Sequence, residues 1–158
     1  MAHQNYYLDL CVDTFIVNGD SVLLRLHEKY NLWSAPGGHI DAGEDVNEAA
    51  LREVWEEAGM KVELVGPHGW EKKNEKTNID LVPPIFMNRH SITDTHDHSA
   101  LIFAAKSETR SVEPQTEEDK VATFKWCTQN ELDELLKTDE RMRPEIHRYA
   151  SMALQLIS

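Results

Sequence analysis

Short apolar runs separated by turn residues dominate the first part of the chain, and this pattern predicts β-strands. Residues 10–28, LCVDTFIVNGDSVLLRLHE, contain two runs rich in aliphatic and β-branched residues on either side of Asn18-Gly19-Asp20. Asn-Gly between two such runs is a strong signal for a β-hairpin. Residues 31–45 contain one proline and three glycines, so this segment is predicted to form a loop.

The next segment, residues 45–59 (DVNEAALREVWEEAG), predicts an α-helix. It is rich in good helix formers, has no interior glycine or proline, and ends on Gly59, which is placed to cap its C-terminus. Each residue turns a helix by about 100°, so Glu53, Glu56 and Glu57 fall within an arc of about 100°. The opposite side is expected to hold an apolar stripe that docks on a sheet: Leu51, Val54, Trp55 and Ala58.

The second half of the chain predicts further strands and two more helices. Strands are expected within 61–70, 84–92, 98–107 and 121–127, and polar loops at 71–84 and 111–120. Thr128 and Glu131 have capping-box spacing at the start of one helix, and Pro144 is a suitable first residue for the last helix. Strands and helices are mixed without a regular βαβ alternation. We therefore expect one α/β domain over residues 1–158, with a mixed sheet covered by helices.

Composition and charge exclude several classes of partner. The 158 residues include 28 acidic side chains against 16 Lys and Arg, for a formal net charge of -12. Such a chain repels polyanions, so long nucleic acid is an unsuitable partner, whereas a small anionic substrate fits if a metal or a few basic residues bridge the charges. No apolar run approaches the ~20 residues that span a bilayer, and the N-terminus lacks a signal-peptide pattern. Two distant cysteines, Cys11 and Cys127, show neither metal spacing nor a disulfide framework, which favours a reducing cytoplasm.

Two interpretations of the three helix glutamates are open from composition alone: a solvated acidic face, or a site for a cation. No lysine is interleaved with them for pairing at a spacing of three or four. They also lie near the helix C-terminus, where the helix dipole disfavours negative charge, and a glycine-rich loop precedes the helix. Mg²⁺ binds carboxylate oxygens and keeps water and substrate phosphate as further ligands. These features favour the cation site.

Residues 38–60, GHIDAGEDVNEAALREVWEEAGM, resemble the Nudix box at each of its fixed positions. That motif reads Gly, five residues, Glu, seven residues, then Arg-Glu-apolar-any-Glu-Glu-any-Gly-apolar. The matching residues are Gly38, Glu44, Arg52, Glu53, Val54, Glu56, Glu57, Gly59 and Met60. The preceding LWSAPGG (32–38) and the later FKWCTQNEL (124–132) are also similar to segments of this family, although only the box matches residue by residue.

The resemblance implies an α/β/α sandwich with a mixed β-sheet, in which the box is a loop-helix-loop. It implies Mg²⁺- or Mn²⁺-dependent hydrolysis of a P–O–P bond in a small nucleotide, either a (d)NTP or a nucleoside diphosphate linked to another group. The metal shell that it implies is Glu53, Glu56, Glu57 and the carbonyl of Gly38. Arg52 is implied to orient Glu53 or Glu56 by a charge-assisted hydrogen bond, and Glu44 to support the loop. Homodimers are common in the family.

Two locations are open for the general base. Some Nudix enzymes use a glutamate of the box, which here is Glu53, and others use one from a distal loop. The acidic loop offers Glu113, Glu117 and Glu118, of which we favour Glu118. A solvated loop charge is an equally good interpretation of that residue.

Residues outside the box supply further candidates for substrate binding. His96 and His98 share one face if their segment is extended, and they are interpreted either as substrate contacts or as part of a polar strand entrance. A zinc site is a third interpretation, which no cysteine spacing supports. Trp33 either stacks on a base or packs in the core, and Arg25 is a candidate phosphate partner.

The sequence does not identify the substrate, because the markers of the ADP-sugar and diadenosine polyphosphate subgroups are absent from their expected places. Two rival functions stay open. One is a catalytically silent Nudix-fold module that binds a nucleotide or regulates another protein, and such modules usually lose box glutamates. The other is a Nudix-fold isomerase acting on a prenyl diphosphate, whose box is altered. This chain keeps every box residue, which favours the hydrolase over both.

Overall fold

The computed structural model describes residues 7–158. The helices and strands follow this order: β1 (Tyr7–Asn18), β2 (Ser21–His27), β3 (Leu32–Ser34), β4 (Gly37–His39), α1 (Val46–Ala58), β5 (Glu63–Val65), β6 (Asn74–Glu75), β7 (Asn78–Ile79), β8 (Phe86–Thr93), β9 (His96–Lys106), the 3-10 turn η1 (Asp119–Val121), β10 (Thr123–Cys127), α2 (Gln129–Thr138) and α3 (Pro144–Ile157). Residues 1–6 lie outside the described residues. They belong to the N-terminal segment in which the sequence predicts no signal peptide. None of the helices in the described range is long and apolar enough to cross a membrane.

Eight of the described strands form one mixed sheet around the long strands β1 and β9. These two run parallel from the Tyr7–His96 pair to the Val17–Lys106 pair. The other pairings in this sheet are antiparallel, and they join β1 to β2 and β4, β2 to β3 and β10, and β9 to β5 and β8. The β1–β2 hairpin turns at Gly19, whose φ is 61°, as the Asn-Gly signal predicts.

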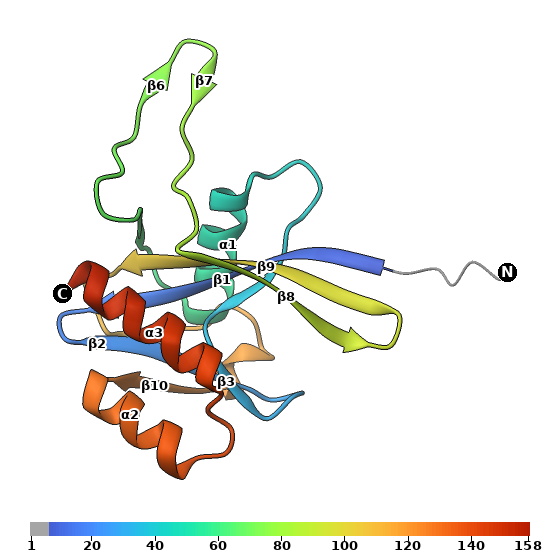
Figure 1. The fold of residues 1–158 in the computed structure, drawn as a ribbon, viewed down its shortest axis with the longest axis vertical. Coiled ribbons are helices and arrows are strands. Elements are labelled where there is room, and N and C mark those ends of the chain that lie inside the picture. Colours follow the sequence, from blue (N-terminus) through green and yellow to red (C-terminus); the bar gives the residue numbers. More distant parts are fainter. Residues whose placement is uncertain (1–6) are drawn as a thin grey trace, which may run out of the picture.

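Alternation of side chains along β1 divides the core into two halves. Phe15 and Val17 pack on one face with residues of α2 and α3. Val12 and Ile16 point to the other face, where they belong to the clusters that include the buried side of α1. Figure 1 shows α3 in front of the sheet and α1 behind it. The fold is therefore the α/β/α sandwich that the resemblance implies.

The two C-terminal helices begin where their capping signals predict. The Thr128 side chain accepts the backbone N–H of Glu131, and the Glu131 side chain accepts the backbone N–H of Thr128, which completes a capping box at α2. Pro144 occupies the first turn of α3. Each helix start is thus determined by residues within a few positions of it.

Two segments predicted as loops carry short strands. Residues 31–45 contain β3 and β4, each three residues long, which pair with β2 and β1. Residues 71–84 contain the β6–β7 hairpin, which stands away from the body of the protein in Figure 1. Strands of two or three residues are too short to show an alternating pattern, so sequence periodicity could not detect them.

Candidate active site

The helix that carries the clustered glutamates is fixed at both ends. Asp45 caps its N-terminus, and the side chain of Glu48 accepts the backbone N–H of Asp45, which gives a capping box. Gly59 caps the C-terminus in the left-handed conformation with φ 65°, as its position predicts. A side chain at Gly59 would collide with the backbone carbonyl of Glu113. The same glycine therefore ends α1 and lets the acidic loop pack against that end.

The buried stripe of α1 differs from the predicted one. Val54 and Ala58 are buried as expected, but Leu51 and Trp55 are 40% and 43% exposed. The helix buries small residues against the sheet instead, and its buried residues are Ala49, Ala50, Val54 and Ala58. Small side chains let the helix lie close to β1 and β9, which leaves the larger residues on the helix flank. The prediction for Leu51 and Trp55 was wrong because it took the side opposite the glutamates as the buried one, whereas the helix is turned so that Ala49 and Ala50 face the sheet.

Arg52 joins the acidic residues at the two ends of the box. Its Nη2 and Nε donate to the two carboxylate oxygens of Glu44 at 2.6 and 3.0 Å. Its Nη1 donates to Glu53 at 2.8 Å and to Glu56 at 3.3 Å, and Nη2 also donates to the carbonyl of His39 at 2.9 Å. The Arg52 guanidinium lowers the pKa of Glu44 to about 2. Glu44 thus holds Arg52, and Arg52 holds the loop and two of the helix glutamates in place.

Glu57 is held between the glycine loop and β2. The backbone N–H of Gly37 donates to its Oε2 at 2.9 Å, and Nη2 of Arg25 lies 3.7 Å from its Oε1. Burial nevertheless raises the pKa of Glu57 to about 8, because these two partners only partly offset the loss of water. A further cation next to Glu57 would therefore stabilise its ionised carboxylate.

Glu53 faces the second glycine of the same loop. A Cβ at Gly38 would collide with the carboxyl group of Glu53, so the absence of a side chain at Gly38 lets this carboxylate approach the loop backbone. Burial raises the pKa of Glu53 above its ordinary value, and Arg52 acts in the opposite direction. Glu56 is different, since its side chain is 43% exposed. The structure brings Glu53, Glu57 and Gly38 together and leaves Glu56 at the margin.

Asp13 is an acid near the box that the sequence reasoning did not single out. It is paired with Gly37 across β1 and β4. Burial raises its pKa to about 7, and the negative charge of Glu53 adds to the shift. One signal was available in the sequence, because a charged residue interrupts the otherwise apolar run LCVDTFIV (10–17). Its position next to the glycine loop, however, depends on the pairing of β1 with β4.

Arg25 is buried and paired with acids. Its Nη2 donates to Oδ1 of Asp119 at 2.6 Å, and the other oxygen of Asp119 accepts from the hydroxyl of Thr116. Glu118, the predicted distal base, is exposed at the start of η1, whereas its neighbour Asp119 is buried. The acid of this loop that reaches the box through Arg25 is therefore Asp119, which sequence reasoning missed. Arg25 as a phosphate partner and Glu118 as a base stay predictions.

A cleft of about 770 Å³ opens beside these residues, a size typical of small-molecule sites. Its wall includes Arg25, Gly37 and Gly38, which all contact box glutamates. Trp33 contributes to the wall but is 5% exposed, and its indole N–H donates to Asp139 at 3.0 Å. The Trp33 ring therefore packs in the core. Base stacking by Trp33 stays a prediction.

The two histidines that were predicted as substrate contacts, His96 and His98, lie at the start of β9. His96 and His98 share one face of β9, as the extended segment predicts, and their ring centroids are 4.9 Å apart. His98 lines the cleft. Nε2 of His96 lies 2.8 Å from a carboxylate oxygen of Asp9. Their role as substrate contacts stays a prediction.

The donor set of the box suits a hard divalent cation. Glu53 and Glu57 are carboxylates with raised pKa values, so Arg25 and Arg52 do not fully offset the cost of burying their charge. Carboxylate and carbonyl oxygens are the ligands that Mg²⁺ and Mn²⁺ take in proteins. A divalent cation next to Glu53 and Glu57 would lower their pKa values and so offset the effect of burial.

The fold and the box define a three-layer α/β/α protein with its glutamate-rich helix behind a glycine loop. The chain belongs to the Nudix family, because the sequence profile described as NUDIX domain matches residues 8–149. A hydrolase of this family from Clostridium perfringens is similar over 95% of this chain and 98% of its own, with 29% identity and a TM-score of 0.79.

More distant proteins share the fold. The MutT protein from Methanosarcina mazei is 17% identical with a TM-score of 0.66, over 95% of each chain. The MutT NUDIX hydrolase from Burkholderia pseudomallei is also 17% identical, with a TM-score of 0.61, over 96% of this chain and 98% of that one. Among curated proteins, phosphatase NudJ from Escherichia coli is 30% identical over 88 residues, which is 52% of this chain. That match spans 58% of the length of NudJ.

Proposed function

We propose that this protein is a divalent-metal-dependent pyrophosphohydrolase that cleaves a P–O–P bond in a small nucleotide. The single observation that carries the proposal is the placement of two largely buried glutamates with raised pKa values, Glu53 and Glu57, against Gly37 and Gly38 of β4. The family membership supports the reaction class, and NudJ is similarly described as a phosphatase. The two cysteines are free and buried, which supports action in a reducing cytoplasm.

Mg²⁺ or Mn²⁺ would be held by Glu57, Glu53, Glu56 and the carbonyl of Gly38. When bound there, the ion stabilises charge on the phosphate oxygens and lowers the pKa of water. The N–H of Gly37 fixes one oxygen of Glu57 in place. Arg52 orients Glu53 and is itself held by two bonds to Glu44. Each of these contacts reduces the motion of a carboxylate before substrate arrives.

Proton removal from the attacking water is assigned to Glu53, with Glu118 as the distal alternative. Arg52 holds the Glu53 carboxylate next to Gly38, beside the proposed metal shell. Glu118 is exposed, so its use would need the substrate to reach the acidic loop. Glu118→Gln distinguishes the two, because Glu118 lies outside the proposed metal shell and a large loss of kcat in that variant would assign the base to it.

The size of the cleft and the net charge of the chain support a small nucleotide as the substrate. A cavity of about 770 Å³ is large enough for a mononucleotide or a nucleoside diphosphate conjugate. The net charge of -12 disfavours long nucleic acid. Trp33, His96, His98 and Arg25 are the proposed contacts of the substrate.

The deciding experiment is hydrolysis across a panel of canonical and oxidised (d)NTPs, ADP-ribose, NDP-sugars and dinucleoside polyphosphates. Each is assayed with Mg²⁺, with Mn²⁺ and with chelator, for the protein and for Glu57→Gln. We expect metal-dependent turnover of one class and a loss of about 10²–10³-fold in the variant, the scale of removing one electrostatic group from an active site. Folded protein that binds metal and turns over no member would favour the silent nucleotide-binding module instead.

A further inference from the structure

Three strands, β1, β4 and β9, bring a group of histidine, cysteine and aspartate side chains to one face of the sheet. Cys11 on β1 is paired directly with His39 on β4. Asp9, two residues earlier on β1, is paired with His98 on β9. Side chains alternate along a strand, so Asp9 and Cys11 share a face, and the pairings place His39 and His98 on that face too. Residues far apart in the sequence therefore meet beside the cleft.

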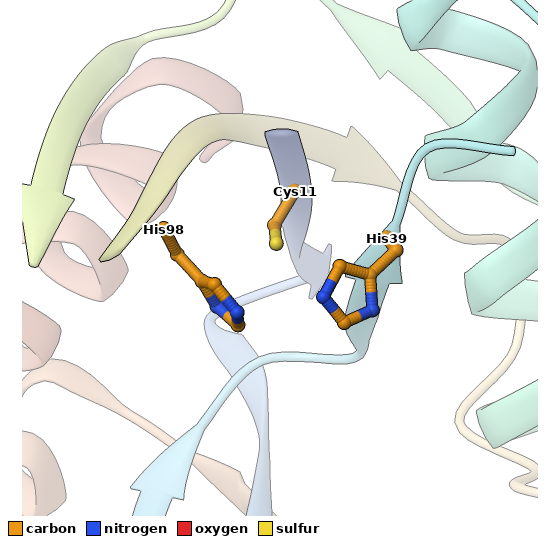
Figure 2. A group of neighbouring side chains, drawn as sticks. All are labelled: Cys11, His39 and His98. Atoms are coloured by element: carbon orange, nitrogen blue, oxygen red, sulfur yellow. The ribbon is translucent and has the colours of Figure 1, made fainter. Parts of the chain in front are cut away.

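The side chains of Cys11, His39 and His98 are close enough to share an ion. Their donor atoms all lie within 4.8 Å of one another. Figure 2 shows the sulfur of Cys11 between the two imidazole rings, whose centroids are 5.0 Å apart. Donors about 2.0–2.3 Å from a tetrahedral ion lie roughly 3.5 Å apart. Side-chain rotations that close the group by about 1 Å reach that geometry.

His98 lacks the partner that a purely structural histidine normally has. Its Nε2 is buried and has no hydrogen-bond partner within the described part of the chain. Buried polar atoms in proteins are usually paired, so such an atom calls for an explanation. Burial and the neighbouring histidines lower the pKa of His98. Its ring is therefore neutral at pH 7 and has a lone pair available for a metal.

Cys11 is likewise without a compensating charge. Burial raises the pKa of its thiol to about 12, and the charges of Asp13 and Asp9 add to the shift. No Lys or Arg contributes to that shift. A bound cation would supply the missing positive charge and release the thiol proton to solvent.

We propose that Cys11, His39 and His98 form a site for Zn²⁺ or a similarly soft divalent ion, separate from the glutamates of the box. Sulfur and imidazole nitrogen are the donors that Zn²⁺ prefers, whereas Mg²⁺ takes oxygen. Three protein ligands leave a fourth position, and all three residues line the cleft. Water or an anionic group of the cleft ligand fills that position. The protein would thus hold a hard ion and a soft ion at two sites beside one cleft.

Asp9 is placed to support this site. Its carboxylate lies 3.6 Å from Nε2 of His39 and 2.8 Å from Nε2 of His96. Histidines that bind metals usually donate a hydrogen bond from their other ring N–H to a carboxylate or carbonyl, which fixes the ring and raises its basicity. The donor atoms of Asp9, His96 and His98 likewise lie within 4.8 Å of one another. His98 therefore belongs to both groups and is the residue on which the site depends most.

Co²⁺ binding to the full chain tests the proposal. Mg²⁺ is kept in large excess so that the box glutamates are occupied, and Co²⁺ is added while near-ultraviolet absorption is recorded. A Co²⁺–thiolate bond gives a charge-transfer band that oxygen and nitrogen ligands do not give. We expect this band at one Co²⁺ per chain, and its loss when Zn²⁺ is added. The readout is independent of nucleotide hydrolysis, so failure of one proposal is separable from failure of the other.

Matched variants assign the band to its ligands. Cys11→Ala and Cys11→Ser remove the sulfur in two ways, and either must abolish the band in protein whose circular dichroism is unchanged. Cys127→Ala is the control, because Cys127 is the other free, buried cysteine and lies on β10, and it must keep the band. His98→Gln should weaken Co²⁺ binding at least about tenfold. No band in the folded protein, or a band that survives loss of Cys11, overturns the proposal.

Discussion

Arg52 holds more of the box together than any one glutamate, and its shape matters as much as its charge. Its planar group donates to Glu44, Glu53 and Glu56 at once, whereas a lysine has no rigid fork to do so. We expect Arg52→Lys to lower kcat about 10–100-fold, the scale of losing a partner that orients a metal ligand. The Mg²⁺ concentration for half-maximal rate should rise, while KM for the nucleotide at saturating Mg²⁺ stays unchanged.

Arg110→Lys is the matched control for Arg52→Lys. Arg110 also makes several hydrogen bonds, but its partners are Asn18 and Asp20 on the hairpin turn. The control should keep the Mg²⁺ dependence of the unaltered protein. An Arg52→Lys protein with the same Mg²⁺ dependence as this control would show that Arg52 does not position metal ligands.

The residues predicted from sequence and those missed differ in how the chain brings them together. Glu53, Glu56 and Glu57 lie on one helix, and helix geometry alone places them on one side. Asp13 and Asp119 reach the same region through strand pairing and through loop packing that joins distant positions. No spacing rule describes such contacts. Local motifs were therefore predictable, and the residues that surround them were not.

At the scale of elements, the junction between α1 and the acidic loop depends on Gly59. Gly59 and Gly43 both have positive φ, at 65° and 91°. An added Cβ at Gly59 would collide with the backbone of Glu113, whereas an added Cβ at Gly43 would have no atom within 4 Å. We expect Gly43→Ala to cost about 1–2 kcal/mol from backbone strain alone. Gly59→Ala should cost a further ~1–3 kcal/mol from the collision with Glu113.

Urea unfolding of the two glycine variants measures this difference. Gly43→Ala serves as the control for backbone conformation, so the excess at Gly59 reports the packing of the acidic loop on α1. Equal losses of unfolding free energy in both variants would mean that the loop does not pack against the helix end.

The β6–β7 hairpin is the element with the least support from the rest of the fold. Residues 71–79 are exposed, and the side chain of Asn47 fixes the chain just after the hairpin through both backbone groups of Val82. Exposed tips with few contacts are the first sites of proteolysis. We expect trypsin to cut first at Lys72, Lys73 or Lys76 and to leave the two fragments associated.

Mass spectrometry of a time course identifies the first cut. Asn47→Ala removes the tether at Val82 and should speed cleavage in this segment by several-fold, because local opening becomes easier. First cleavage elsewhere, for example after Arg25 or Lys125 in the sheet, would contradict this view of the hairpin.

The fold as a whole was easier to predict from sequence than its smallest parts. Long runs and strong turn or cap signals placed the β1–β2 hairpin, the strands β8 and β9 and all three helices. The three-residue strands β3 and β4 were not predicted, although β4 carries the two glycines that face Glu53 and Glu57. Strands this short form because β1 and β2 offer free edges, which is a property of the assembled sheet.

At the scale of the whole molecule, two carboxyl groups of the metal-free protein are protonated in the fold at a pH at which they are ionised in the unfolded chain. Glu57 and Asp13 have pKa values raised to about 8 and about 7, against 4.5 and 3.8 as ordinary values. At pH values between the ordinary and the raised pKa of each group, the folded state binds more protons than the unfolded state. The free energy of unfolding therefore falls as pH rises from about 4 to about 8, and this loss is complete above the folded pKa values.

The interval from pH 7 to pH 8 contains the folded pKa values of both acids. His27, His90 and His98 have lowered pKa values in the fold and an ordinary value of 6.5, so they are mostly neutral in this interval in both states and contribute only a small opposing change. We expect the free energy of unfolding in chelator to fall by about 1 kcal/mol over this interval, since each group contributes up to 1.4 kcal/mol per pH unit. Saturating Mg²⁺ displaces the same protons, so its stabilising effect should be larger at pH 8 than at pH 7.

Urea unfolding at the two pH values, with chelator or with Mg²⁺, measures both slopes. Glu57→Gln and Asp13→Asn replace the titrating groups by neutral amides, so the double variant should show a flat response in chelator and no pH-dependent gain from Mg²⁺. A slope in chelator that survives in the double variant would assign it to other groups. Stability that rises toward pH 8 in the unaltered metal-free protein would mean that Glu57 and Asp13 are already ionised in the fold. Their negative charge would then be balanced without any bound cation.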